Sequence, residues 1–234
     1  MQNNNVHVVP NHLGLILDGN RRWARDQGLP TLEGHRKGYE NLKDIARYAF
    51  DKGVKYVSAY IFSTENWDRT KEEVDYLMSL AMTIAVKDSK KLIKENIKIV
   101  VLGVDDKVPP KLIEAWRSAE ADSKENTGGV LALCFNYGGT REISDAIKRM
   151  IADGVEPGDV DDAKISSYLY HPEVPDVDFM IRTSGEQRIS NFMLWRMKYA
   201  ELYFEQKHWP AFGVKELEVA FEEFANRNRR FGGN

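Results

Sequence analysis

The stretch "LILDGNRRWA" at residues 15–24 places a carboxylate and two cations directly after an apolar run. Glycine and asparagine suit a turn here, but a surface turn has no use for Asp18, Arg21 and Arg22 packed together. Arginines bind phosphate oxygens, and an acid among them would repel such a ligand unless a divalent cation lay between. The pattern therefore predicts a phosphate-type ligand with a metal, and Mg²⁺ suits carboxylate and phosphate oxygens.

Polar and charged residues also follow other apolar runs that resemble strands. In open α/β sheets, ligands bind beyond the carboxyl ends of the strands, so residues at these ends are expected to converge. They are Ser63, Thr64, Glu65, Asn66, Trp67 and Arg69 after the second strand, Asn136 and Tyr137 after the fourth, and Arg182, Ser184, Gly185, Arg188 and Ser190 after the fifth.

Each of these residues also has an ordinary structural explanation. Asp18 alone would serve as a helix N-cap, and any single arginine would pair with a nearby acid. The acids in question are Glu33, Glu65 and Glu186, while His35 suits a surface or partly buried position and Trp67 and Trp195 suit the core. The gathering of phosphate-type groups at separate strand ends favours a binding site over these explanations.

Missing motifs narrow the class of phosphate ligand. No G-x-G-x-x-G follows the first strand and no P-loop is present, which disfavours a dinucleotide or P-loop nucleotide site. An aspartyl phosphatase would suit "LILD", but that chemistry generally wants a second acid two residues later, where Asn20 stands. Such a phosphatase remains a weaker alternative.

Apolar runs and amphipathic stretches alternate along the chain. Strands are expected at 12–18, 54–63, 97–103, 130–138, 177–182 and 200–204, and helices at 42–50, 72–95, 110–125, from 140, at 162–170 and at 214–230. Repeated strand–helix–strand units predict one α/β domain over residues 1–234, with a six-stranded, mostly parallel sheet and helices on both faces.

The expected helix 72–95 is apolar around more than one face. Its stripe consists of Val74, Leu77, Met78, Ala81, Met82 and Ala85, widened by Leu80 and Ile84. Deep burial is the ordinary explanation of such a helix. Beside a diphosphate site, the same stripe also suggests an apolar substrate tunnel.

Composition limits the possible functions. The chain has 234 residues, 42% of them hydrophobic, and a net charge of −3, which gives no global basic field for nucleic acid. The single cysteine, Cys134, lies in an apolar run and is expected to be a small buried side chain. There is no signal-peptide pattern and no stretch of about 20 apolar residues, so a cytoplasmic protein is expected.

Seven segments resemble the signature segments of the cis-prenyltransferases, a family typified by undecaprenyl diphosphate synthase. They are "ILDGNRRWA", "GHRKG", "FSTENWDR", "NYGGTREI", "RTSGEQRISNFMLW", "AELYF" and "RNRRFGG", and they cover nearly the whole chain in the family's order. The resemblance implies Mg²⁺-dependent condensation of isopentenyl diphosphate with an allylic diphosphate, usually farnesyl diphosphate. It also implies a homodimer.

The resemblance assigns roles to individual residues. Asp18 would hold Mg²⁺ with Glu201, and Asn66 would assist removal of a proton at the reacting carbons. Arg22, His35 and Arg69, with the backbone of 19–22, would meet the allylic diphosphate. Arg182, Arg188 and Ser190 would bind the diphosphate of isopentenyl diphosphate, and Trp23, Trp67 and Ser63 would frame the isoprenoid. The full substrate-binding set is Gly19, Asn20, Arg21, Arg22, Trp23, Thr31, His35, Ser63, Thr64, Glu65, Trp67, Arg69, Arg182, Arg188, Ile189, Ser190, Arg230 and Gly232.

Two positions depart from the family pattern. Thr31 stands where many members carry arginine, and Arg21, where many have glycine, is expected to supply that charge. Gln187 replaces a histidine often found after "GE". A non-catalytic partner subunit is the alternative within the family, but such subunits typically lose the acid that Asp18 keeps.

Further expectations concern the termini and the product, and the resemblance carries the one for the tail. Residues 1–11 are expected to be flexible, and the tail 230–234 to reach the partner subunit's site. The product is expected to be a medium-chain polyprenyl diphosphate, of undecaprenyl class or shorter, that serves as a cell-wall lipid carrier. Because this product partitions to the membrane, peripheral association with the membrane surface is a further expectation.

Overall fold

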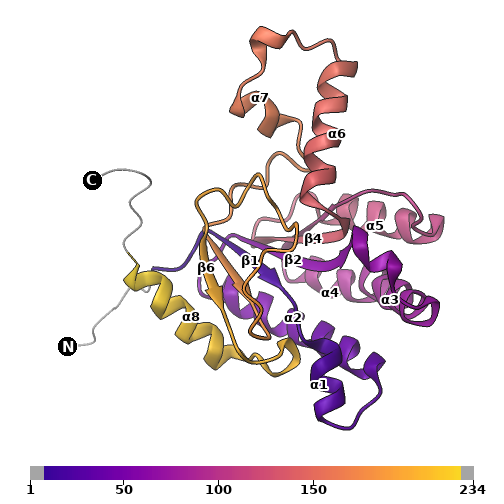
Figure 1. Cartoon of the computed structure of the whole chain (residues 1–234), viewed down its shortest axis with the longest axis vertical. Helices are drawn as coiled ribbons and strands as arrows, with labels where there is room; N and C mark the ends of the chain where they lie inside the picture. Colours follow the sequence, from indigo (N-terminus) through magenta and orange to yellow (C-terminus); the bar gives the residue numbers. More distant parts are fainter. Residues whose placement is uncertain (1–7, 228–234) are drawn as a thin grey trace.

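A six-stranded sheet forms the centre of the molecule (Figure 1). The computed structural model describes residues 8–227. The strands are β1 (His12–Ile16), β2 (Tyr56–Ser63), β3 (Ile97–Leu102), β4 (Gly129–Tyr137), β5 (Phe179–Arg182) and β6 (Glu201–Phe204). Their order is β3-β4-β2-β1-β5-β6, and every neighbouring pair is parallel. The predicted α/β fold is confirmed.

Most of the helices begin at or next to their predicted first residues. The helix at 20–26 is not predicted, and the helix predicted at 42–50 begins eleven residues earlier, at Thr31. The helices are α1 (Asn20–Asp26), α2 (Thr31–Asp51), α3 (Lys71–Thr83), α4 (Ser89–Lys94), α5 (Pro110–Ser123), α6 (Gly139–Ala152), α7 (Asp162–Ser167) and α8 (Val214–Asn226). Short 3₁₀ turns lie at η1 (Thr64–Asp68), η3 (Pro157–Asp159) and η4 (Trp209–Ala211). The helix predicted over 72–95 is interrupted by a π-helical turn, η2 (Ile84–Asp88), between α3 and α4.

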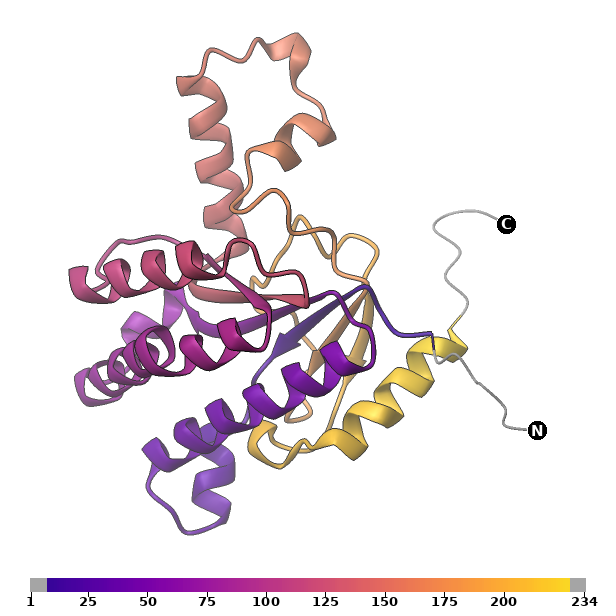
Figure 2. The same cartoon turned by 180° about the vertical axis from the view of Figure 1, so that it is seen from behind.

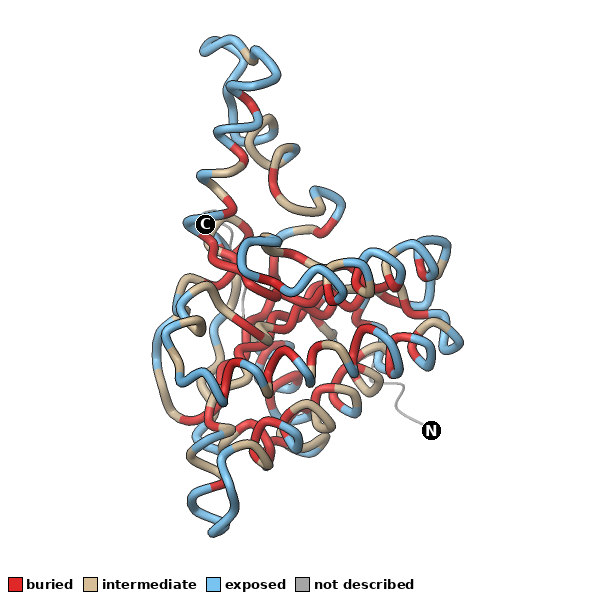
Figure 3. Tube along the Cα trace, turned by 90° about the vertical axis from the view of Figure 1, so that its right-hand side faces the viewer, coloured by how far each residue is buried: buried red, intermediate tan, exposed pale blue. Residues whose placement is uncertain are grey.

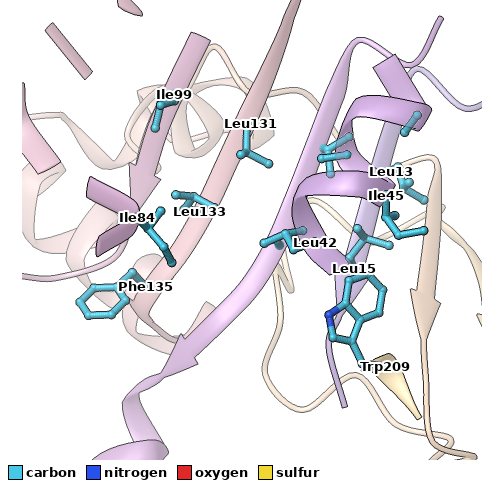
Figure 4. Packing of buried hydrophobic residues seen from close by; sticks show 14 of the residues in the cluster. Leu13, Leu15, Leu42, Ile45, Ile84, Ile99, Leu131, Leu133, Phe135 and Trp209 are labelled. Atoms are coloured by element: carbon cyan, nitrogen blue, oxygen red, sulfur yellow. The ribbon is translucent and has the colours of Figure 1, made fainter. Parts of the chain in front are cut away.

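Helices α2, α3, α4, α5 and α8 cover one face of the sheet (Figure 2). Alternate strand residues point into this layer, because successive side chains of a strand face opposite sides. In Figure 4, Leu13 and Leu15 of β1 lie near Ile45 and Leu42 of α2, and Leu131 and Leu133 of β4 lie near Ile99 and Ile84. This layer also holds the apolar cavity described below.

The other face is covered mainly by segment 168–200, which has little helix. Cys134 and Met180 of the sheet pack there against Phe192, Met193 and Met197. The expectation of helices on both faces is therefore wrong for most of this face. The buried Arg196 explains how an irregular segment can cover it, since its guanidinium donates to the carbonyl groups of Val174, Tyr170 and His171 and to Glu142.

Helices α6 and α7 extend away from the sheet as an arm (Figure 1), and Figure 3 shows that the end of this arm is exposed. Among the described residues, no helix is both long and apolar enough to cross a membrane. Cys134 is fully buried, as predicted, and burial raises the pKa of its thiol well above the ordinary value.

Candidate active site

Asp18 lies between two arginines at the carboxyl edge of the sheet. Ile16 of β1 is level with Arg182 of β5, so Asp18, two residues later, lies beside the end of the neighbouring strand. Its Oδ1 accepts a hydrogen bond from Arg22 and its Oδ2 one from Arg182, each at 2.9 Å. Partial burial alone would raise the pKa of Asp18, but the bonds from Arg182 and Arg22 hold it below the ordinary value. Asp18 is therefore ionised at neutral pH.

The backbone around Asp18 is fixed by close contacts. Its carbonyl oxygen accepts from the Thr183 hydroxyl at 2.7 Å and from the Trp209 N–H at 2.9 Å. Gly19 has φ +101°, and a Cβ there would lie 2.6 Å from the Ser184 hydroxyl, so only glycine fits. Gly19, not Asp18, is the N-cap of α1, which excludes the N-cap explanation of Asp18.

Glu73 of α3 organises the opposite side of the site. This carboxylate is only 6% exposed and contacts His35 Nε2 at 3.0 Å and Arg69 NH1 at 2.8 Å, while Arg21 NH1 lies 3.6 Å away. Burial opposes its charge, but the Arg69 charge and the His35 hydrogen bond keep the pKa of Glu73 low. Burial lowers the pKa of His35, so its imidazole is neutral at pH 7.

Glu73 is not among the site residues predicted from the sequence. The signal available was its i,i+4 spacing from Arg69, which allows an ion pair on a helix, yet such pairs are common on surfaces and rarely mark a site. Arg21 and Thr31 line the same charged pocket, and the supply of charge by Arg21 in place of an arginine at Thr31 stays a prediction.

Asn66 lies in the turn after β2. Its side-chain carbonyl oxygen accepts from the Ser63 N–H at 3.0 Å, a capping contact that orients the amide. Thr64 donates to Glu65, whose other oxygen accepts from Asn191.

Arg182 is buried and holds the loop after β5 in place. Its NH1 donates to the Ser190 hydroxyl at 2.7 Å and to the carbonyl of Arg188 at 2.6 Å. The exposed Arg188 pairs with Glu186, which also accepts from Arg22 at 3.0 Å. The pairing of arginines with Glu186 is thus confirmed for Arg22 and Arg188.

Three cavities meet around these residues. A first charged pocket of about 660 Å³ is lined by Asp18, Gly19, Asn20, Arg21, Arg22, Arg25, Thr31, His35 and Arg69, with Leu17, Leu29 and Pro30. A second charged pocket of about 590 Å³ is lined by Asp18, Ser63, Glu65, Asn66, Arg69, Arg182, Arg188, Ser190 and Asn191, with Ile16, Leu17 and Tyr60. Leu17, Asp18 and Arg69 line both pockets.

The third is an apolar cavity of about 120 Å³ between the sheet, α2 and α3. Leu42, Ile61, Leu77, Ala81, Ile84 and Phe135 are among the residues that line it. Asn20 and His35 border it together with the first charged pocket, and Tyr60 and Asn66 together with the second. A ligand with an apolar chain and an anionic head would find surfaces for both parts here.

Several residues at this edge have left-handed backbone conformations. Asn136, Ser184, Ser190, Asn191 and Met193 all have positive φ. Non-glycine residues rarely adopt this region, and such positions gather at functional sites where surrounding contacts hold them. The loops at the carboxyl edge are therefore held in one shape by the structure around them.

Some predicted site residues lie elsewhere. Within one chain, Glu201 is level with Phe179 and Leu13, at the amino ends of the strands, whereas Asp18 follows their carboxyl ends. Its carboxylate accepts from Arg227 at 3.0 Å. One chain therefore does not bring Glu201 to Asp18, because parallel strands separate their two ends.

Three other residues of the predicted set, described next, line none of the three cavities. Trp67 packs edge-on against Phe62 and donates to Asn136 at 2.8 Å. Trp23 is half-buried in α1, and Ile189 packs against the second core layer. Arg230, Gly232 and the tail 230–234 lie outside the described residues, as do residues 1–7 of the predicted flexible segment 1–11.

The residues around Asp18 suit a Mg²⁺ ion that is held largely by substrate. An ionised carboxylate has about four lone-pair positions, and the two arginines occupy two of those on Asp18. The described residues contain no group of three or more His, Cys, Asp or Glu able to hold a metal. Mg²⁺ commonly binds one or two carboxylates together with substrate phosphates, which matches this donor set.

Comparison with known proteins gives the family. The family model described as "Putative undecaprenyl diphosphate synthase" matches residues 16–232. The chain belongs to this prenyltransferase family. The prenyltransferase is 42% identical over 228 residues to an isoprenyl transferase of Thermotoga maritima, a match that covers 96% of this chain and 97% of the relative.

Two further relatives agree with this assignment. A Micrococcus luteus ditrans,polycis-undecaprenyl-diphosphate synthase, named as (2E,6E)-farnesyl-diphosphate specific, is 40% identical over 240 residues, covering 100% of this chain and 96% of that protein. The crystal structure of lavandulyl diphosphate synthase from Lavandula x intermedia, in complex with dimethylallyl diphosphate, superposes with a TM-score of 0.91 at 34% identity. That match covers 98% of this chain and 100% of the plant chain.

Proposed function

We propose that this prenyltransferase condenses isopentenyl diphosphate with an allylic diphosphate, foremost farnesyl diphosphate, and forms a cis double bond at each addition. The meeting of two charged pockets with one apolar cavity supports this proposal. Each charged pocket suits one diphosphate, and the apolar cavity suits the prenyl chain of the allylic substrate. The product proposed is a medium-chain polyprenyl diphosphate of undecaprenyl class or shorter, serving as a cell-wall lipid carrier.

The allylic diphosphate is assigned to the first charged pocket. Arg21, Arg22, Arg69 and the amide groups near Gly19 and Asn20 would bind its oxygens, and His35 would lie where head and chain join. Mg²⁺ held at Asp18 would neutralise the diphosphate as it leaves the allylic carbon. Preorganised cations that face developing charge lower the barrier most, and these arginines are already held by Asp18, Glu73 and Glu186.

The second charged pocket is assigned to isopentenyl diphosphate. Arg182, Arg188 and Ser190 would bind this diphosphate, and Asn66 lies between the pocket and the apolar cavity, where the two carbon chains would meet. Ser63, Thr64 and Glu65 support that wall. Asn66 would orient the condensing carbons for loss of the proton, while a diphosphate oxygen is the stronger base available.

The active unit is proposed to be a homodimer in the cytoplasm or at the membrane surface. Glu201 is able to join a metal site only from the partner subunit, given its position in the sheet. Asp18 is thus proposed as the one metal ligand that each chain supplies to its own site.

Incubation of the pure protein with farnesyl diphosphate, isopentenyl diphosphate and Mg²⁺, followed by separation of the products by length, tests the proposal. We expect a series of polyprenyl diphosphates of increasing length. Addition of a metal chelator should abolish their formation. Absence of any condensation by the protein alone would support the non-catalytic partner subunit instead. Phosphate release from simple monoesters without condensation would support the phosphatase.

A further inference from the structure

Tyr39 of α2 separates the apolar cavity from the protein surface. A groove of about 370 Å³ lies on the outside between α2, α3 and the π turn η2. Among the described residues, Tyr39 and Leu80 line both this groove and the apolar cavity. These two side chains therefore form the partition between the cavity and the groove.

Tyr39 is held by a buried carboxylate. Its hydroxyl donates to Asp88 Oδ2 at 2.6 Å, and Asp88 is only 5% exposed. Lys43 Nζ lies 4.6 Å from the centre of the Tyr39 ring and 3.6 Å from the same Asp88 oxygen. Lys91 Nζ lies 3.8 Å from the other oxygen of Asp88, and pairing with two lysines offsets the cost of burying this carboxylate. Its buried neighbours Ile84 and Ala85 in η2 are apolar.

The π turn places a change of helical register beside this contact. Such turns are rare and are frequent at functional sites. Asp88 is the last residue of η2, and Ile84, its first, lines the apolar cavity. A movement of η2 away from α2 would therefore separate Tyr39 from Asp88 and widen the cavity at once.

The closed cavity is small for the product. At about 120 Å³ it approaches an engineered cavity of about 150 Å³ that accepts one benzene molecule. We propose that the hydrogen bond between Tyr39 and Asp88 is a latch on the outer wall of the cavity, and that this latch limits the length of the prenyl chain. A growing chain either stops at the partition or breaks the latch and extends into the groove. This inference rests on the proposed condensation.

The test compares product ladders of four single variants. Tyr39→Phe keeps the ring and removes the donor, and Asp88→Ala removes the acceptor, so both are expected to shift the ladder to longer products. Asp88→Asn keeps an acceptor oxygen for Tyr39 and is expected to retain the wild-type ladder. Tyr48→Phe is the matched control, because the Tyr48 hydroxyl also joins α2 to a carboxylate, Glu218, away from the cavity.

Two further measurements separate the latch from general damage. The rate of the first condensation in a single turnover shows whether a latch variant alters the chemistry as well as the product length, and Tyr48→Phe, outside the three cavities, should keep the wild-type rate. Thermal unfolding of each variant shows whether it is folded at the assay temperature. Because Tyr39→Phe and Asp88→Ala remove the same hydrogen bond from opposite sides, the latch can still be tested if one of them does not fold. An unchanged ladder in folded Tyr39→Phe and Asp88→Ala would overturn the latch. Absence of condensation by the wild-type protein would instead overturn the proposed function.

Discussion

At the scale of single residues, Asp18 is, within the described residues 8–227, the one acid that lines both charged pockets. Asp18→Ala is expected to abolish condensation, because a metal ligand that acts as charge develops matters more in the transition state than in the ground state. Steady-state assays with circular dichroism as the check on folding measure this. The matched variant Asp26→Ala changes an exposed acid of α1 outside the three cavities and should stay active. Near wild-type turnover in Asp18→Ala would contradict the metal assignment.

Another residue-scale prediction concerns His12, which is fully buried in β1. Its ring contacts the Ser58 hydroxyl at 2.7 Å and the Pro175 carbonyl at 2.9 Å, and burial lowers its pKa from 6.5 to about 4. His12 is therefore protonated near pH 6.5 in the unfolded chain but only near pH 4 in the folded chain. As the pH is lowered from 6.5 to 4, His12 should therefore reduce the free energy of unfolding by an amount on the order of 3 kcal/mol.

Urea unfolding of wild type and His12→Gln at pH 7 and pH 4 measures this effect. The variant is expected to be less stable at pH 7, but its stability should depend less on pH. His171→Gln is the contrast: burial opposes protonation of His171, but Glu120 and Glu173 raise its pKa, so it stabilises the fold below its unfolded pKa. Its removal should cost more stability at pH 5 than at pH 8. Parallel pH curves for all three proteins would contradict both assignments.

At the scale of elements, Ile61 of β2 and Phe135 of β4 both line the apolar cavity. Strand alternation alone leaves the direction of these side chains open, and the structure places both in the cavity wall. Ile61→Ala and Phe135→Ala are each expected to lengthen the products, since each removes volume that the chain would otherwise have to displace. Phe135 is only 4% exposed, so its variant should also lose about 3–5 kcal/mol of stability.

Product ladders and unfolding curves for both variants show whether Ile61 and Phe135 limit product length or only support the core. Val57→Ala in β2, in the core but outside the three cavities, is the matched control for a loss of packing. A wild-type ladder with lowered stability in the two cavity variants would make Ile61 and Phe135 ordinary core residues.

The elements that the sequence predicts correctly are those with an apolar run or a helical stripe. All six strands are found, because each contains a run of mainly apolar residues, including β6, which is only partly buried. The π turn at η2 is not predicted, because Ile84, Ala85 and Asp88 are compatible with ordinary helical spacing and the change of hydrogen bonding leaves no pattern. Likewise, the convergence of Asp18, Arg22 and Arg182 follows from the parallel strands, whose carboxyl ends meet at one edge of the sheet. The contacts of Glu73 with His35, Arg69 and Arg21 depend instead on how α2 and α3 pack, which the sequence does not show.

At the scale of the whole molecule, the fold turns a nearly balanced chain into a locally cationic one. The net charge is only −3, yet the described part of the chain brings six arginines to the two charged pockets. They are Arg21, Arg22, Arg25, Arg69, Arg182 and Arg188. Composition cannot predict this, because it depends on which strand ends lie together.

The tail 230–234 gives a prediction about the assembly. Deletion of these residues is expected to raise the KM for isopentenyl diphosphate, because Arg230 and Gly232 are proposed to bind diphosphate in the partner's site. Steady-state kinetics with each substrate varied in turn measure this. Deletion of residues 1–5 is the matched truncation and should leave both KM values unchanged. Unchanged kinetics after removal of the tail would assign it no role in binding.

A mixed dimer shows which chain the tail serves. One subunit lacks residues 230–234 but keeps Asp18, and the other carries Asp18→Ala but keeps its tail; two affinity tags isolate the pair. If the tail acts on the partner's site, the site with intact Asp18 receives the tail of the other subunit, and about half of wild-type activity should return. If the tail acts on its own site, both sites are defective and activity should stay as low as in either homodimer. Failure to isolate a mixed dimer at all would contradict the proposed homodimer.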